Sequence, residues 1–170
     1  MLGRFSKISL IIIIMLFVSC SSISYVSLYK NAQTSLTKNI VLSLLYQVPS
    51  ERIKQIIDSD NSQILQQKEI ERISARQSIH PNMFKKNQLQ RIQYANTLYS
   101  EQLKKGMFTD RGRIYIKYGE PTAILDMNDK TLGKTQKWNY SELNKTFVFL
   151  YNEDHYTYKL YNVQDEDYFE

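Results

Sequence analysis

The sequence predicts an α+β fold in which helices pack on a small antiparallel sheet that ends in a three-strand meander. Two patterns support this: apolar residues recur at helical spacing within 50–105, and apolar or aromatic residues alternate with polar ones within 136–163. A length of 170 residues suits one domain. With 42% hydrophobic and 23% charged residues, the composition is that of a folded chain.

The N-terminus has the pattern of an export signal that ends in a lipid-attachment site. The basic segment "MLGRFSK" precedes the apolar block "ISLIIIIMLFV", which suits a secretory signal and is too short to span a bilayer by itself. The following "LFVSC" resembles a bacterial lipobox, with Ser19 before the cleavage point and Cys20 as the lipid acceptor. Phe17 stands where such sequences usually have Leu, Val or Ile.

The cysteine count is consistent with lipidation, because Cys20 is the only cysteine and excludes an intramolecular disulfide. Ser21 after the cysteine resembles lipoproteins that are sent to the outer membrane. An alternative is an uncleaved transmembrane anchor over 8–29, since no charge occurs between Lys7 and Lys30. A third reading is a buried cytosolic helix.

The chain is expected to divide into a signal peptide (1–19), the lipidated cysteine with a linker and first strand (20–30), one α+β domain (31–163) and an acidic tail (164–170). Residues 22–30 and 40–48 are rich in β-branched and aromatic residues and predict a hairpin. Its turn would be the polar segment between them.

Three helices are expected next, at about 50–58, 62–77 and 82–105. Pro49 ends the preceding segment and Ser50 can cap the first helix. Pro81 suits the first turn of the third helix, and Gly106 would end it in a left-handed conformation. The segments 136–141, 146–151 and 155–163 then predict the meander.

The stretch "GMFTDRGRIYIKYGEP" (106–121) combines glycines, charges and an apolar run, and predicts a turn that contains Thr109 and Asp110. Gly112 would supply a positive φ. The alternation in 113–118 favours a strand. The alternative is a short helix that Thr109 caps and that Gly119 and Pro121 end.

The same stretch resembles the signature of the bacterial GWxTD-domain proteins, which runs Gly-Trp-x-Thr-Asp into R-G-R-I-Y-I and G-x-P. "RIQYAN" (91–96) and the W-x-Y…F-x-F order of Trp138, Tyr140, Phe147 and Phe149 are also similar to that family. Met107 replaces the named tryptophan. A weaker likeness, to small outer-membrane assembly lipoproteins, favours binding over chemistry. The resemblance implies an exported envelope protein and no known reaction. The motif residues that it marks for possible binding are Gly106, Thr109, Asp110, Arg111, Gly112, Arg113, Tyr115, Gly119, Pro121, Trp138 and Tyr140.

Catalytic residues are not identified. The charges at Asp110, Arg111 and Arg113 are typical of side chains that pin a turn. The two histidines, His80 and His155, are far apart and lack partners at metal-ligand spacing, so no metal or cofactor is expected. The sequence has no phosphate-binding loop, dinucleotide fingerprint or nucleophile elbow.

We therefore expect a lipid-anchored envelope protein that faces the periplasm and acts in interaction or assembly by binding a protein partner, without catalysis. The membrane is its first partner, through Cys20. Nucleic acid is not expected, because loss of the leader's Arg4 and Lys7 lowers the net charge from +5 to +3. Two alternatives stay open: a glycan- or peptide-processing enzyme that uses Asp110 and Glu120, and a carbohydrate-binding module that uses a face shared by Tyr156 and Tyr158.

Overall fold

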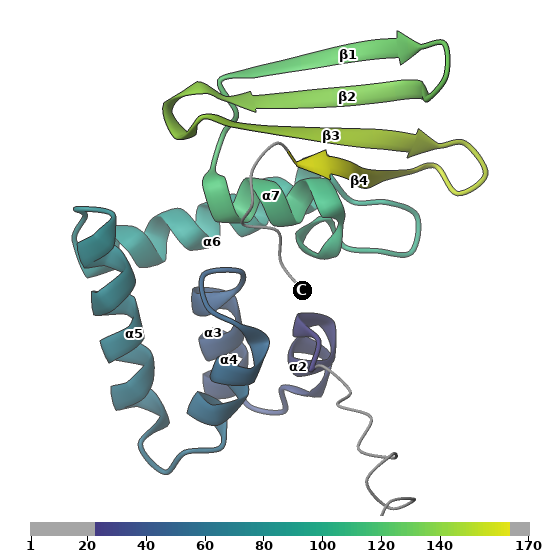
Figure 1. Ribbon diagram of the computed structural model, residues 1–170. Helices are drawn as coiled ribbons and strands as arrows, with labels where there is room; N and C mark the ends of the chain where they lie inside the picture. Colours follow the sequence, from purple (N-terminus) through teal and green to yellow (C-terminus); the bar gives the residue numbers. More distant parts are fainter. Residues whose placement is uncertain (1–22, 164–170) are drawn as a thin grey trace, which may run out of the picture.

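A computed structural model describes residues 23–163 of the chain and places a group of helices below a four-stranded sheet (Figure 1). The predicted signal peptide (1–19), Cys20 and the acidic tail (164–170) lie outside the described residues. The main elements in chain order are α2 (Tyr25–Asn31), α3 (Ser35–Leu44), α4 (Ser50–Ile57), α5 (Ser62–Arg76), α6 (Pro81–Leu98), the 3-10 turn η2 (Gly106–Phe108), α7 (Asp110–Tyr118), β1 (Ala123–Asp129), β2 (Gly133–Tyr140), the 3-10 turn η3 (Ser141–Leu143), β3 (Lys145–Asn152) and β4 (Thr157–Val163).

The sheet is an antiparallel meander in the order β1-β2-β3-β4. This confirms the α+β class and the C-terminal meander and adds β1, a strand that the sequence analysis does not predict. Trp138 lies opposite Ile124 on one side and Phe147 on the other. Trp138, Phe147 and Phe149 are almost completely buried, so this row of side chains faces the helices.

The predicted N-terminal hairpin is wrong, because both of its segments are helices. Ser24 caps α2 by accepting a hydrogen bond from the Ser27 amide, and Thr34 and Thr37 form a reciprocal capping box at the start of α3. Ile40 and Leu44 of α3 have no exposed surface. An apolar run that is buried around most of a helix cannot be distinguished from a buried strand by periodicity alone.

The predicted helices at 50–58 and 62–77 are confirmed as α4 and α5, but the third helix ends earlier than expected. α6 stops at Leu98, and a tight turn that pairs Glu101 with Lys104 follows it. Tyr99 is buried against Trp138 at a ring separation of 5.1 Å. Gly106 therefore does not end this helix, and it has no positive φ.

The strand favoured for 113–118 is also wrong, and the alternative, a capped helix, is correct. The Thr109 side chain accepts a hydrogen bond from the Gly112 amide, and Gly119 ends α7 with φ 89°. Ile114, Tyr115 and Ile116 are all buried, because α7 lies between α6 and the sheet (Figure 1). Burial on several sides produces the alternation that resembles a strand.

Buried polar contacts join the helices as well. Gln88 of α6 is 1% exposed and donates a hydrogen bond to the Leu45 carbonyl at 2.8 Å, where α3 ends. Glu69 of α5 accepts hydrogen bonds from Arg52 at 3.1 Å and Arg72 at 2.8 Å, which links α5 to α4.

Within residues 23–163, no helix is both long enough and apolar enough to cross a membrane.

Glu69 predicts an acid-sensitive contact between α4 and α5. Burial raises the pKa of Glu69, but hydrogen bonds and charge from Arg72 and Arg52 outweigh it, so the pKa lies below its ordinary value of 4.5. A lowered pKa stabilises the fold above the unfolded value, and this stabilisation is lost as the pH falls through the folded value. We expect the stability difference between wild type and Glu69→Gln in urea titrations to shrink as the pH falls from about 5 to about 3, through the unfolded and then the folded pKa of this carboxyl group. A difference that stays constant over that range would contradict this.

Candidate functional site: the 106–121 turn and the surfaces that it positions

Three backbone segments meet without intervening side chains at the start of the 106–121 turn. A β-carbon on Gly106 would lie 1.8 Å from the Ala95 carbonyl oxygen of α6, and one on Gly112 would lie 1.8 Å from the Gly106 carbonyl oxygen. Both positions therefore require glycine for close approach. The expected positive φ at Gly112 is wrong, because this residue lies inside α7.

Side chains from α6 and its C-terminal end bind the backbone of η2. Asn96 accepts a hydrogen bond from the Met107 amide at 2.9 Å, and the Ser100 hydroxyl accepts one from the Gly106 amide at 2.9 Å. Thr109 donates to the Gly106 carbonyl at 2.9 Å while it caps α7. The turn is thereby held at one orientation on α6.

The C-terminal end of α7 is bound in a similar way. Arg91 donates to the carbonyl groups of Ile116 and Lys117, both at 3.3 Å. The Tyr140 hydroxyl donates to the Gly119 carbonyl at 2.9 Å, and burial raises the pKa of this phenol. Pro121 is buried just before β1. These bonds fix the point where the chain passes from α7 into the sheet.

Two carboxylates from the helical part cover the β4 edge of the sheet. Glu101 accepts a hydrogen bond from the Tyr158 amide at 3.0 Å, and Asp110 accepts one from the Leu160 amide at 2.9 Å. Asp110 also lies 3.7 Å from Arg113. The charges therefore pin elements, as the sequence analysis expects, although the element that Asp110 holds is a strand.

Arg111 is held between aromatic rings. Its guanidinium carbon lies 3.8 Å from the centre of the Tyr158 ring and 5.4 Å from that of Tyr99, and burial lowers its pKa. A terminal nitrogen approaches the Gln136 side-chain oxygen at 3.5 Å, and Trp138 donates to the same oxygen at 2.8 Å. Arg111 thus joins α7 to the sheet.

Tyr115 and Trp138 belong to one aromatic cluster. Tyr115 stacks on Tyr94 at 4.6 Å, and Tyr99 contacts both Tyr115 at 5.7 Å and Trp138 at 5.1 Å. Met107, at the position of the family's tryptophan, is 1% exposed, and its carbonyl accepts a hydrogen bond from Tyr46. Its side chain is therefore part of the core.

The two carboxylates of the enzyme alternative, Asp110 and Glu120, do not come together. Asp110 is the first residue of α7. Glu120 lies beyond the other end of this helix, directly after its C-cap Gly119. An α-helix rises about 1.5 Å per residue, so the two backbones lie roughly 12 Å or more apart. His80 caps α6, and among residues 23–163 no group of three or more His, Cys, Asp and Glu side chains could hold a metal ion.

The prediction that Tyr156 and Tyr158 share one exposed face is also wrong. Tyr156 lies in the β3–β4 turn with φ 51° and is 64% exposed, whereas Tyr158 is buried beneath Arg111. These two rings therefore do not form one exposed platform.

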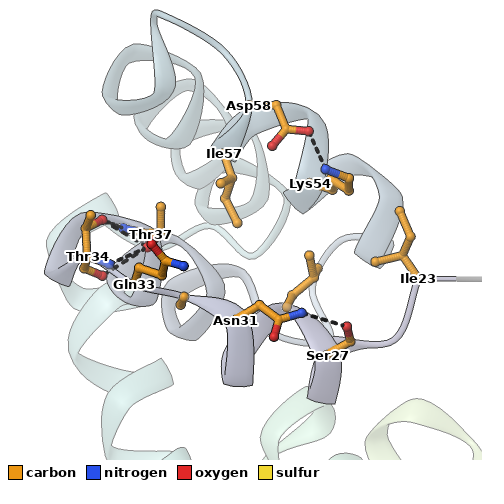
Figure 2. Close-up of a pocket in the computed structure, with 11 residues that line it drawn as sticks. Ile23, Ser27, Asn31, Gln33, Thr34, Thr37, Lys54, Ile57 and Asp58 are labelled. Atoms are coloured by element: carbon orange, nitrogen blue, oxygen red, sulfur yellow. Dashed lines mark hydrogen bonds and ion pairs between the residues drawn. The ribbon is translucent and has the colours of Figure 1, made fainter.

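A pocket of about 470 Å³ lies between α2, α3 and α4 (Figure 2). Its polar side chains already bind one another in three pairs: Ser27 with Asn31, Thr34 with Thr37, and Lys54 with Asp58. The sequence does not predict this pocket, because most of its lining residues lie between 23 and 37, in the segment expected to form a hairpin. The pairing leaves few polar groups to select a ligand.

Comparison with known protein families shows which family the chain belongs to. The family model of the GWxTD domain matches residues 22–170, and the chain belongs to this family. No curated protein and no solved structure matches the chain.

The close approach at Gly106 predicts a large cost for a single methyl group. Gly106→Ala would drive its β-carbon into the Ala95 carbonyl and should lower the free energy of unfolding by about 3 kcal/mol. Gly133→Ala is the matched control, because a β-carbon there meets nothing within 4 Å and only its φ of 71° is unfavourable, at about 1 kcal/mol. Chemical denaturation of both variants tests this; equal costs would contradict it.

The carboxylate at the β4 edge predicts a second stability effect. Asp110→Ala leaves the Leu160 amide without its acceptor and should cost about 2 kcal/mol of unfolding free energy. Asp154→Ala, in the exposed β3–β4 turn, should change it by less than about 0.5 kcal/mol. Hydrogen exchange should accelerate at Leu160 in the first variant, and unchanged exchange there would argue against the contact.

Proposed function

We propose that this chain is a lipid-anchored protein of the bacterial cell envelope that acts by binding a protein partner rather than by catalysis. The anchor would be a lipid on Cys20. The membrane would be the outer membrane, with the domain facing the periplasm. The alternative is a single uncleaved transmembrane anchor within the same N-terminal segment.

The main support for a non-catalytic role is that charged side chains of the 106–121 turn are bound to other parts of the domain. Asp110 binds the Leu160 amide and Arg111 lies between two tyrosine rings, so both side chains serve the fold. A general acid or base needs a free group near a bound substrate. The separation of Asp110 from Glu120 counts against the enzyme alternative, and the burial of Tyr158 counts against the carbohydrate-binding alternative.

Support for the anchor comes from the sequence. A basic start, a short apolar block and a single cysteine in the context "LFVSC" agree with an acylated N-terminus. Two acyl chains or more give stable membrane attachment, because each buried methylene contributes about 0.8 kcal/mol.

Substitution of the cysteine tests this proposal. Wild-type protein, produced in a diderm bacterium that is fed an alkyne analogue of palmitate, should become labelled and sediment with membranes. Cys20→Ala should lose the label and lose attachment, because no other cysteine can accept the lipid.

Ser21→Ala is the matched control and should keep the label. A Cys20→Ala variant that stays in the membrane without label would favour the uncleaved anchor. Label on the Cys20→Ala variant would reject lipidation at this residue.

A further inference from the structure

The two edges of the sheet differ. β4 has its amides at Tyr158 and Leu160 occupied by carboxylates of the helical part. β1 is the opposite edge and pairs with β2 alone among the described residues (Figure 1). Its sequence, AILDMND, has no Pro and no Lys, the residues used most often to protect an edge from further pairing, and its only charged residues are Asp126 and Asp129.

Exposed apolar side chains occur on β1 and near the C-terminal end of α6, which aromatic contacts join to the sheet. Ile124 of β1 is 45% exposed on the face it shares with Trp138. Trp138 packs on Tyr99, and Tyr99 contacts Tyr94 of α6, which is 42% exposed. Leu98, four residues after Tyr94 on the same side of α6, is 52% exposed. We call Tyr94, Leu98 and Ile124 the edge patch.

Two acidic side chains lie along this edge. Glu120 is exposed just before β1 and takes part in no ion pair found within residues 23–163. Asp126 is exposed at the centre of β1 and accepts a hydrogen bond from the Gln136 side chain at 2.8 Å. Arg91 and Arg111 lie near the same part of the domain, but their guanidinium groups are engaged, the first by two backbone carbonyl groups and the second by two tyrosine rings.

The open edge of β1, the edge patch and the two acidic side chains together indicate what kind of segment could bind there. Unpaired backbone groups of an edge strand require an extended backbone opposite them, and alternate side chains of that segment would reach the edge patch. Asp126 and Glu120 favour a basic side chain on the segment. A second copy of this chain fits less well, because pairing over the full length of β1 would set Asp126 opposite Asp126, and like charges directly opposite are destabilising.

We propose that β1 accepts an extended segment of a partner protein as a fifth strand, and that this segment alternates apolar side chains with polar ones and carries Lys or Arg toward Asp126 and Glu120. The inference rests on the proposed function of the chain as a binding protein. It adds the class of partner and the surface used.

A peptide selection tests the proposal. Full-length protein in detergent is used to select from a phage-displayed library of random dodecapeptides, and the most enriched peptide is synthesised. We expect enriched peptides to alternate apolar with polar residues and to carry Lys or Arg. Bound peptide should slow hydrogen exchange in residues 123–129.

Four variants define the surface. Ile124→Lys should weaken binding of the synthetic peptide about tenfold or more, since it places a cation in the edge patch. Ile64→Lys on α5, with 56% exposure, is its matched control and should bind as wild type does. Glu120→Lys should weaken binding several-fold, and Glu153→Lys, in the exposed β3–β4 turn, should not. If Ile124→Lys fails to fold in circular dichroism, Leu98→Lys, in the edge patch on α6 and 52% exposed in the wild type, replaces it.

Several results would overturn the proposal: no enriched peptide, an acidic consensus, protection outside 123–129, or equal affinity for Ile124→Lys and Ile64→Lys. Self-association that Ile124→Lys abolishes in sedimentation would assign the edge to a second copy instead. The Cys20→Ala variant should bind the peptide normally, so a failure of the anchor and a failure of the edge are told apart.

Discussion

The contact of bare backbone at Ala95, Gly106 and Gly112 is the constraint on which the remaining architecture depends. It places the backbone of η2 directly against α6 on one side and against α7 on the other, with no room for a β-carbon at either glycine. With α7 in that place, Asp110 reaches the Leu160 amide and Arg111 reaches the Tyr158 ring. A methyl group at either glycine would shift α7, and both links to β4 would lengthen together. The sheet is therefore positioned by a packing contact that contains no side chain.

Asp110 and Arg111 of the turn are both bound to β4, so these charged side chains stabilise the fold and are not free to act on a substrate. A carboxylate that accepts a backbone N–H bond and a guanidinium between two rings are both fixed by their partners. The same arrangement makes the two edges of the sheet unequal, because it occupies the β4 edge, whereas β1 pairs with β2 alone among the described residues. In this chain the side chains of the motif mainly support the fold, and the surface that we propose for binding lies mostly along β1.

The sequence predicts the α+β class, α4, α5 and the last three strands, because each of these has one clear period. It misassigns segments that are buried on several sides. Ile40, Val41 and Leu44 of α3, and Ile114, Tyr115 and Ile116 of α7, give nearly continuous apolar runs in which helical spacing is hidden. β1 is missed because Ile124, Leu125 and Met127 are exposed and its polar positions include two acids. For the candidate site, the importance of Gly106, Thr109 and Asp110 could be predicted. The partner of Asp110, fifty residues away in β4, could not be, since only the tertiary fold brings that amide to the carboxylate.

The place where the chain enters the domain has a consequence for orientation. Ser50 donates a hydrogen bond to the Ile23 carbonyl, and Tyr25 donates one to the Val48 carbonyl at 2.6 Å, so the domain begins at residue 23. An extended chain spans at most about 3.5 Å per residue, so a lipid on Cys20 would lie within roughly 10 Å of Ile23. Figure 1 shows α2 below the sheet, with β1 as the strand farthest from it. A tether this short would keep α2 against the bilayer and turn β1 toward the aqueous compartment, where an extended segment from another envelope component could approach it.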